Sequence, residues 1–266
     1  MNRKKLIFVA VFFMVIGCAA QGIFVADLTV DEIVEKANIA SYYAGNDGLS
    51  DVVMTIADAQ GRERVRDFRI LRMTVKQGAE QKFFVYFRKP SDVAKMVYMV
   101  WKNIGKDDDR WLYLPALDLV RRVAASDKRS SFVGSHFVYE DVSGRGTQVD
   151  THELVSEEGD TYKIKNVPKD KSGLEFAYYF VWVRKDNFLP VKAEYYNEKD
   201  SLIRSIEALE IKDIQGFPTV TKSAAKDLVR GGQTTMEFSN STYNVGLTDD
   251  IFSERYLRQP PSQWIK

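Results

Sequence analysis

Few side chains of this 266-residue chain are of the types that do chemistry. It contains two histidines, His136 and His152, and one cysteine, Cys18. His136 and Glu140 have the spacing of a metal-ligand pair on a helix, but no third ligand accompanies them. The chain has no His-Glu-x-x-His, Gly-x-Ser-x-Gly or phosphate-loop motif. The sequence therefore predicts a protein that is not an enzyme and that holds neither a metal ion nor a cofactor.

The balance of basic and acidic residues argues against nucleic-acid binding. The chain has 38 Lys and Arg residues against 37 Asp and Glu residues. Removal of an N-terminal segment that contains Arg3, Lys4 and Lys5 would leave 35 basic residues against 37 acidic ones. Nucleic-acid affinity depends on clustered Lys and Arg without compensating acidic residues. We therefore expect no nucleic-acid partner.

The N-terminus has the order of regions found in a bacterial secretory signal. A basic start at residues 1–5 precedes the eleven apolar residues 6–16, and small residues follow. The apolar run would span ~16 Å as a helix, which is short of the ~30 Å hydrocarbon core of a bilayer. We therefore predict a signal peptide over residues 1–17, or to residue 26 if cleavage occurs later, and a periplasmic protein. An uncleaved anchor that extends to residue 26 is the alternative.

The single cysteine lies where lipidation would occur. Residues 15–18, Val-Ile-Gly-Cys, resemble the lipobox of bacterial lipoproteins, in which the cysteine becomes the lipidated first residue. This interpretation predicts a tether over residues 18–26 and attachment to the outer membrane through Cys18, since Ala19 is not the Asp that commonly marks inner-membrane retention. Ordinary signal cleavage a few residues later, which would remove Cys18, is the alternative.

The first element of the mature chain is predicted to be a helix over residues 30–44. Thr29 and Glu32 have the spacing of a capping box at its N-terminus. Apolar residues then recur every three or four positions, which places them on one face, and Gly45 follows as a stop signal. We expect this apolar face to pack on a sheet.

After residue 50 the apolar period changes to two, which indicates β-strands. Turn residues such as Gly231 and Gly232 separate the strands, and no further long helix is apparent. This pattern favours an antiparallel meander in a single domain. The predicted strands cover residues 51–58, 65–75, 82–87, 96–101, 110–114, 119–124, 162–167, 174–183, 191–196, 202–211, 220–225 and 234–238.

Residues 126–146 interrupt the strand pattern. This segment is too long for a hairpin turn and too apolar for an ordinary surface loop, so we interpret it as a lid or plug. We predict that Phe132, Val133, Phe137 and Val138 face the concave side of the sheet. Gly134 would provide a hinge or a close approach of the backbone.

Three of the predicted strands are apolar on both faces, whereas an antiparallel strand exposed on one side should alternate. A closed barrel core whose Tyr and Trp tips reach solvent would explain this. A sheet curled around a cavity for an apolar ligand would explain it equally well. The alternation leaves open which set of side chains faces inward. Aromatic content selects, as candidate cavity residues, Phe83, Val85, Phe87, Met99, Trp111, Tyr113, Phe180 and Trp182.

One stretch carries a specific set of motifs. Residues 111–117 are Trp-Leu-Tyr-Leu-Pro-Ala-Leu, residues 121–122 are Arg-Arg, and residues 132–141 have the pattern Phe-x-Gly-Ser-x-Phe-x-Tyr-Glu-Asp. These motifs resemble those of the outer-membrane lipoprotein-sorting protein family, the LolA-like group. Weaker matches extend the resemblance from about residue 27 to the C-terminus. The family usually has Asp at the position of His136.

The resemblance implies a fold class and a function. LolA-like proteins are α+β proteins with mostly antiparallel strands, in which an unclosed, strongly curved β-barrel is covered by a few helices. They hold acyl chains of lipoproteins or lipids in the hollow. The resemblance thus predicts a lipid-binding domain over residues 27–266, with acyl chains as ligands and an inner-membrane exporter as a further partner. The alternatives are a fixed accessory subunit of such an exporter that carries no ligand, and a hydrolase without a recognisable site.

Overall fold

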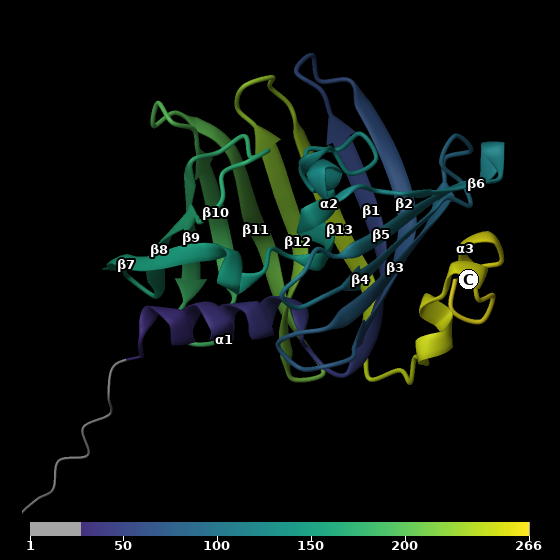
Figure 1. Ribbon diagram of the computed structural model, residues 1–266, viewed down its shortest axis with the longest axis horizontal. Helices are drawn as coiled ribbons and strands as arrows, with labels where there is room; N and C mark the ends of the chain where they lie inside the picture. The colour runs from purple at the N-terminus through teal and green to yellow at the C-terminus, as the bar shows by residue number, and fades with distance from the viewer. Residues whose placement is uncertain (1–27, 266) are drawn as a thin grey trace, which may run out of the picture.

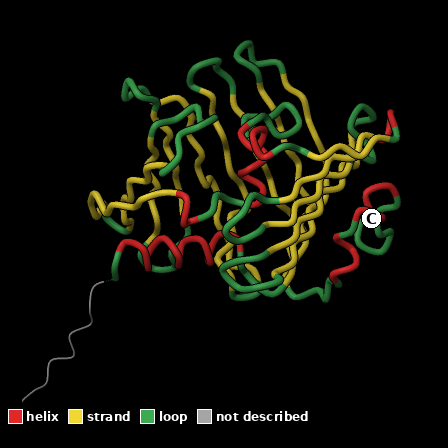
Figure 2. The backbone as a smooth tube through the Cα atoms, in the orientation of Figure 1, coloured by secondary structure: helices red, strands yellow, loops and turns green. Residues whose placement is uncertain are grey.

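The computed structural model describes residues 28–265 of the chain (Figure 1). The signal peptide, the tether and the lipidated Cys18 predicted for the N-terminus lie outside these residues. Within them, thirteen antiparallel strands form one sheet, and its two edge strands are not neighbours of each other. The sheet curls without closing, and helices cover it (Figure 2). This confirms the predicted α+β class with an unclosed, strongly curved β-barrel.

Strands that are consecutive in the sequence are neighbours in the sheet, with one exception at β6 and β7, which lie at opposite edges. The first strand pairs with the last, so the chain runs outward from the middle of the sheet to β6 and returns from the other edge, β7, to β13. The strands are β1 (Asp47–Ala57), β2 (Glu63–Thr74), β3 (Gln81–Lys89), β4 (Val97–Lys102), β5 (Asp109–Leu114), β6 (Leu119–Arg122), β7 (Asp150–Glu158), β8 (Thr161–Pro168), β9 (Tyr178–Arg184), β10 (Pro190–Tyr196), β11 (Leu202–Ile214), β12 (Phe217–Asp227) and β13 (Gln233–Tyr243).

The helices of the described residues are short except for the first one. Three are α-helices and four are single 3₁₀ turns, labelled η. They are α1 (Val30–Tyr42), η1 (Pro115–Leu117), η2 (Ala125–Arg129), α2 (Tyr139–Ser143), η3 (Thr147–Val149), η4 (Asp249–Phe252) and α3 (Glu254–Arg258).

The predicted N-terminal helix is confirmed as α1, which ends two residues earlier than expected. Its capping box is present: the Glu32 carboxylate accepts from Thr29 N at 2.8 Å, and Thr29 Oγ1 accepts from Glu32 N at 3.3 Å. The buried side chains Ile33 and Ala37 pack on β8 and β9. The helix therefore covers one end of the concave face (Figure 1).

The edge strand β7 is not among the predicted strands. Its sequence, Asp-Thr-His-Glu-Leu-Val-Ser-Glu-Glu, lacks regular apolar alternation, and most of its side chains are exposed. An edge strand with little to bury has no strong period-two signal, because the signal comes from burial of one face. The predicted strand at residues 174–183 is also shorter in the structure, since β9 begins at Tyr178.

The C-terminal segment, residues 245–265, forms a cover that the sequence did not predict. Its η4 and α3 lie on the outer side of β3, β4 and β5 (Figure 1). There the buried side chains of Ile251, Phe252 and Leu257 pack against those of Phe84 and Met99. The lid segment (residues 126–146) covers the opposite, concave face of the same strands. These two covers explain why β3 and β4 are apolar on both sides.

Candidate functional site

A cavity of about 510 Å³ lies between α1, the lid segment and the concave face of the sheet. This volume falls within the roughly 300–1,000 Å³ typical of small-molecule sites. Its lining is mainly apolar and comes from all three elements: Val34 and Ala37 of α1, Phe132, Phe137 and Val142 of the lid segment, and Phe68, Ile70, Val85, Ile206, Val220, Met236 and Phe238 of the strands. The curved sheet therefore encloses space that an apolar chain can occupy.

The structure divides the eight candidate cavity residues between the two faces of the sheet. Phe83 and Val85 line the cavity. Phe87 lies on the same concave face and is fully buried against the lid segment. Met99 and Trp111 lie on the opposite face, within the apolar cluster that the C-terminal segment covers. The partly buried Tyr113 packs against that same outer cluster.

The two candidates on β9 also point away from the cavity. Val181 and Val183 line it, and the alternating residues Phe180 and Trp182 occupy the outer face. There Lys163 Nζ lies 5.1 Å from the centre of the Phe180 ring and 4.9 Å from that of Trp182. Lysine stems thus cover the aromatic rings of this outer surface.

The lid segment places its apolar side chains against the concave face. Phe132 is 1% exposed, and its ring lies 5.6 Å from that of Tyr98 and 5.9 Å from that of Phe87. Phe137 and Val138 are also buried. At the tip, Val133 and Gly134 have φ angles of 49° and 79°, so the chain turns through two left-handed residues. That the segment opens to admit a ligand stays a prediction.

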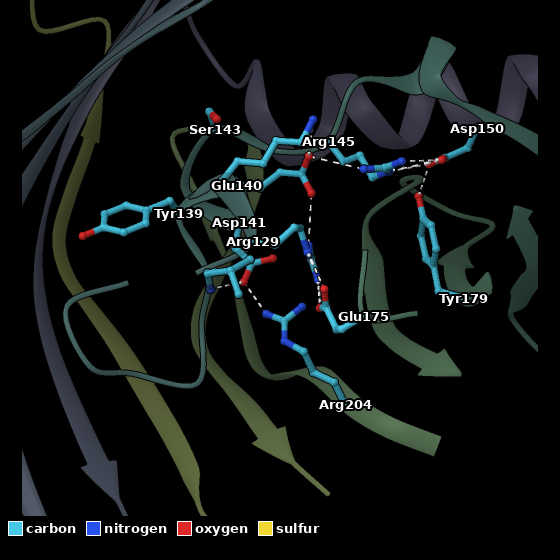
Figure 3. A network of polar contacts seen from close by, with 12 residues as sticks. Arg129, Tyr139, Glu140, Asp141, Ser143, Arg145, Asp150, Glu175, Tyr179 and Arg204 are labelled. Carbon is cyan, nitrogen blue, oxygen red and sulfur yellow. Dashed lines mark hydrogen bonds and ion pairs between the residues drawn. The ribbon is translucent and has the colours of Figure 1, made fainter. Parts of the chain in front are cut away.

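A network of buried ion pairs joins the lid segment to the sheet (Figure 3). Arg129 donates to Glu140 at 3.0 Å and to Glu175 through Nε at 3.3 Å. Burial would lower the pKa of the Arg129 guanidinium, but the hydrogen bond and the charge of Glu175 outweigh burial, so the pKa is raised. Arg145 also donates to Glu140, at 3.3 Å. Glu140 therefore connects two arginines at the polar wall of the cavity.

A second ion pair of the network holds the lid segment to β11. Arg204 donates through Nη2 to the Asp141 carboxylate, and through Nε to the carbonyl oxygen of His136 at 3.3 Å. Sequence reasoning did not single out the arginines of this network. Arg204 and Arg129 reach carboxylates 63 and 46 residues away, at Asp141 and Glu175, which no local pattern indicates. Arg145 lies five residues from each of its partners, Glu140 and Asp150. The available signal was the Tyr-Glu-Asp end of the motif at residues 132–141, which supplies two of the carboxylates.

The two histidines have separate structural contacts. His136 Nδ1 lies 2.8 Å from Thr234 Oγ1, and burial lowers the pKa of His136. The structure does not bring His136 and Glu140 together as a ligand pair, because residues 131–138 do not form a helix and Glu140 is bound by arginines. His152 lies between Asn166 Oδ1 and the Thr147 carbonyl oxygen, at 2.7 and 2.8 Å.

Within residues 28–265, no group of three or more His, Cys, Asp or Glu side chains is arranged to hold a metal ion. None of the helices in the same range is long and apolar enough to cross a membrane.

Comparison with known proteins identifies the family. The crystal structure of a DUF1329 family protein from Desulfovibrio piger is 31% identical in sequence, with a TM-score of 0.77, and the match covers 85% of this chain and 95% of that chain. The chain belongs to the DUF1329 family. A family model described as that of an uncharacterized protein matches residues 79–259. A search of the curated proteins gives no match.

Other solved structures share the fold of this DUF1329 protein. A domain from Vibrio parahaemolyticus described as an outer membrane lipoprotein-sorting protein is 24% identical, with a TM-score of 0.78, and the match covers 86% of this chain and 98% of that one. A LolA superfamily protein from Nitrosomonas europaea is 19% identical, with a TM-score of 0.67, over 86% of this chain and 99% of that one. The predicted resemblance to the LolA-like group and its fold is thereby confirmed.

Proposed function

We propose that this DUF1329 protein binds acyl chains of lipids or lipoproteins in the cavity beneath the lid segment and carries them without catalysis. The observation that supports this most directly is the apolar lining of the 510 Å³ cavity between α1, the lid segment and the curved sheet. Two proteins of the same fold are named for lipoprotein sorting or for the LolA superfamily, which supports the same class of ligand.

The energetics of such binding follow from burial of the chain. Each methylene group that leaves water contributes about 0.8 kcal/mol, or roughly a fourfold change in affinity. Affinity should therefore rise with chain length and level off when the cavity is full. It should depend little on salt, because apolar burial has no ionic component and buried charges are only weakly screened.

The location proposed for the protein is the periplasm. We infer that residues 1–17 are removed as a signal peptide and that Cys18 becomes the lipidated N-terminus. Residues 18–26 would then tether the domain at residues 27–266 to the outer membrane. A tethered protein acts as a receptor rather than as a diffusing shuttle. The intact mass of the mature protein tests this inference, since a mass without acyl chains would exclude lipidation.

Native mass spectrometry of the mature protein, followed by lipid extraction, tests the carrier function. We expect lipid from the cell to accompany the protein and added fatty acids to bind with a dependence on chain length. A matched pair of variants on β11 sharpens the test. Ala208 lines the cavity, whereas the adjacent Leu209 is 51% exposed. Ala208→Trp should reduce uptake by filling the cavity, and Leu209→Trp should leave uptake unchanged.

The outcome that contradicts the carrier function is equally clear. A protein that carries no lipid from the cell and takes up no added fatty acid would overturn the proposal. The alternative of a fixed accessory subunit of an exporter would then be favoured.

A further inference from the structure

The cations that line the cavity differ in whether a carboxylate neutralises them. Arg129, Arg145 and Lys192 each form an ion pair, with nitrogen–oxygen distances of 3.0, 2.8 and 2.6 Å. Arg72 also lines the cavity. Among the residues that the structure describes, no carboxylate oxygen lies within 4.0 Å of its guanidinium. Arg72 is therefore the cavity cation whose charge the described part of the chain leaves without a direct counter-ion.

Arg72 lies on the concave face of β2. Its side chain lies on the same face of the strand as those of Phe68 and Ile70, four and two residues away. Its cross-strand neighbours are Gly48 of β1 and Phe83 of β3, and all of these residues line the cavity. A positive charge at this position interrupts an otherwise apolar row. The two ends of the cavity therefore differ: the end at Arg72 is charged, and the end at Phe68, beside the lid segment, is apolar.

The hydrogen bonds of Arg72 go to neutral oxygens. Nη1 donates to Thr74 Oγ1 at 2.9 Å, and Nη2 donates to the carbonyl oxygens of Ala44 and Gly45, just after α1. Burial lowers the pKa of the guanidinium, and the charge of Asp47, which is too far away for an ion pair, offsets this effect only in part. An anion in the cavity would offset this cost and accept from Nε, which has no acceptor among the described residues.

Hydroxyl groups surround the same end of the cavity. Gly48 leaves room for the ring of Tyr243, since a Cβ at position 48 would lie 3.0 Å from Tyr243 Cδ1 and 2.9 Å from the carbonyl oxygen of residue 242. The Tyr243 hydroxyl lies 2.8 Å from Thr219 Oγ1. Two residues further along the same strands, the hydroxyls of Ser50 and Ser241 are also 2.8 Å apart. All four groups line the cavity. Thr219 donates to the Phe217 carbonyl oxygen, so the Tyr243 hydroxyl donates to Thr219, whereas Ser50 donates to Ser241, whose own proton is left for an anion.

We propose that this end of the cavity binds the anionic head group, a carboxylate or a phosphate, of a single-chain amphiphile. Arg72 is its counter-ion, and the alkyl chain extends over Ile70 and Phe68 toward the lid segment. This inference rests on the proposed acyl-chain binding and adds the chemistry of the head. A charge-assisted hydrogen bond inside a cavity is shorter and stronger than a neutral one, so the head group should contribute to selectivity as well as affinity.

Three probes of equal chain length test the head group: hexadecanoate, hexadecyl phosphate and hexadecan-1-ol. In calorimetric titrations of the wild-type protein, at least one anion should bind about tenfold more tightly than the alcohol, because hydrogen bonds to charged groups are about twice as strong as neutral ones. The anion that shows the preference identifies carboxylate or phosphate as the head. Equal affinities for all three probes would overturn the inference.

Variants of two arginines localise the effect. Arg72→Gln should abolish the preference for anions and leave the affinity for the alcohol almost unchanged. Arg62→Gln removes a charge whose side chain is 78% exposed, so it should retain the preference. Arg72→Lys keeps the charge and should retain part of the preference for anions. This variant serves as the test if Arg72→Gln unfolds because it loses the hydrogen bonds to the residues after α1. A preference that survives in Arg72→Gln would also overturn the inference.

The same titrations separate this inference from the proposed function. Binding of all three probes with equal affinity would leave acyl-chain binding in place and remove the role of Arg72. No binding of any probe would remove both.

Discussion

Arg145 and Asp150 form a two-point ion pair where the lid segment passes into β7, with Nε–Oδ2 and Nη2–Oδ1 distances both of 2.8 Å. The Tyr179 hydroxyl donates to the same carboxylate at 2.7 Å. The Asp150 side chain is 1% exposed, so these contacts replace its hydration. The pair therefore ties the end of the lid segment to β9 through a charge that water does not reach (Figure 3).

We predict that Asp150→Asn lowers the free energy of unfolding by about 3–5 kcal/mol, because it leaves a buried guanidinium without its main partner. Urea denaturation measures the change. Asp186 provides a matched control, since it also forms a two-point ion pair with an arginine, Arg184, but its side chain is 56% exposed. Asp186→Asn should leave the free energy of unfolding almost unchanged. Equal losses in the two variants would contradict the assignment of Asp150 as a buried structural charge.

How far the sequence predicts the fold depends on how local each signal is. The α1 helix could be predicted because its cap, Thr29 with Glu32, and its apolar stripe lie within a few residues. The interior strands could be predicted because each buries one face or both. The curved, unclosed arrangement followed from the family resemblance at residues 111–142, since period-two alternation is compatible with a closed barrel as well.

The candidate site could be predicted only in part. Alternation shows that Phe180 and Val181 face opposite sides of the sheet, but it does not show which side is concave. Selection by aromatic content therefore gave Phe180 as a cavity residue, although Val181 lines the cavity. That choice is decided by the covers: the C-terminal segment packs on the side of Met99 and Trp111, and the lid segment packs on the other. The Arg204–Asp141 pair joins residues 63 apart, and no local pattern encodes such a contact.

A second prediction concerns the acid stability of the protein. Burial raises the pKa of Asp51, but hydrogen bonds from Arg69 and Asn240 and the charge of Arg88 outweigh this and lower the pKa to about 2, from 3.8 for an unperturbed aspartate. A lowered pKa in the folded state means that the stabilisation is complete above about pH 4 and is lost as the pH falls toward 2. Thermal melts across this range should show a steep decrease in Tm.

The variant Asp51→Asn tests the origin of that decrease. At pH 7 it should lower the free energy of unfolding by about 1.5–3 kcal/mol, the usual contribution of hydrogen bonds to a charged group. The difference from the wild-type protein should then shrink below pH 4. Asp186→Asn is the control, because Asp186 forms an exposed ion pair with Arg184 and its loss should not change the acid dependence of stability. If the difference between Asp51→Asn and the wild-type protein stays constant from pH 7 to pH 2, Asp51 is not the source of the decrease in Tm.

A third prediction separates the two phenylalanines of the lid segment. Phe132 lies among four aromatic rings and should act as a core residue, so Phe132→Ala should cost about 3–5 kcal/mol of stability. If the segment opens, Phe137→Ala should accelerate release of bound fatty acid more than it lowers stability. Stopped-flow displacement and thermal melts measure the two effects. A large stability loss with unchanged release in Phe137→Ala would assign the whole segment to the core.

The last prediction uses two adjacent residues of β3 that face opposite sides of the sheet. Phe83 lines the cavity and is 2% exposed, whereas Phe84 is fully buried under the C-terminal segment. Each Phe→Ala change removes a buried ring and should cost about 3–5 kcal/mol. Only Phe83→Ala also enlarges the cavity, so it alone should shift the chain length at which fatty-acid affinity levels off toward longer chains. Titration of both variants with a fatty-acid series, below their melting temperatures, measures this shift. The same plateau in both variants would mean that the ligand does not contact the concave side of β3, and the binding site would then have to lie elsewhere on the protein.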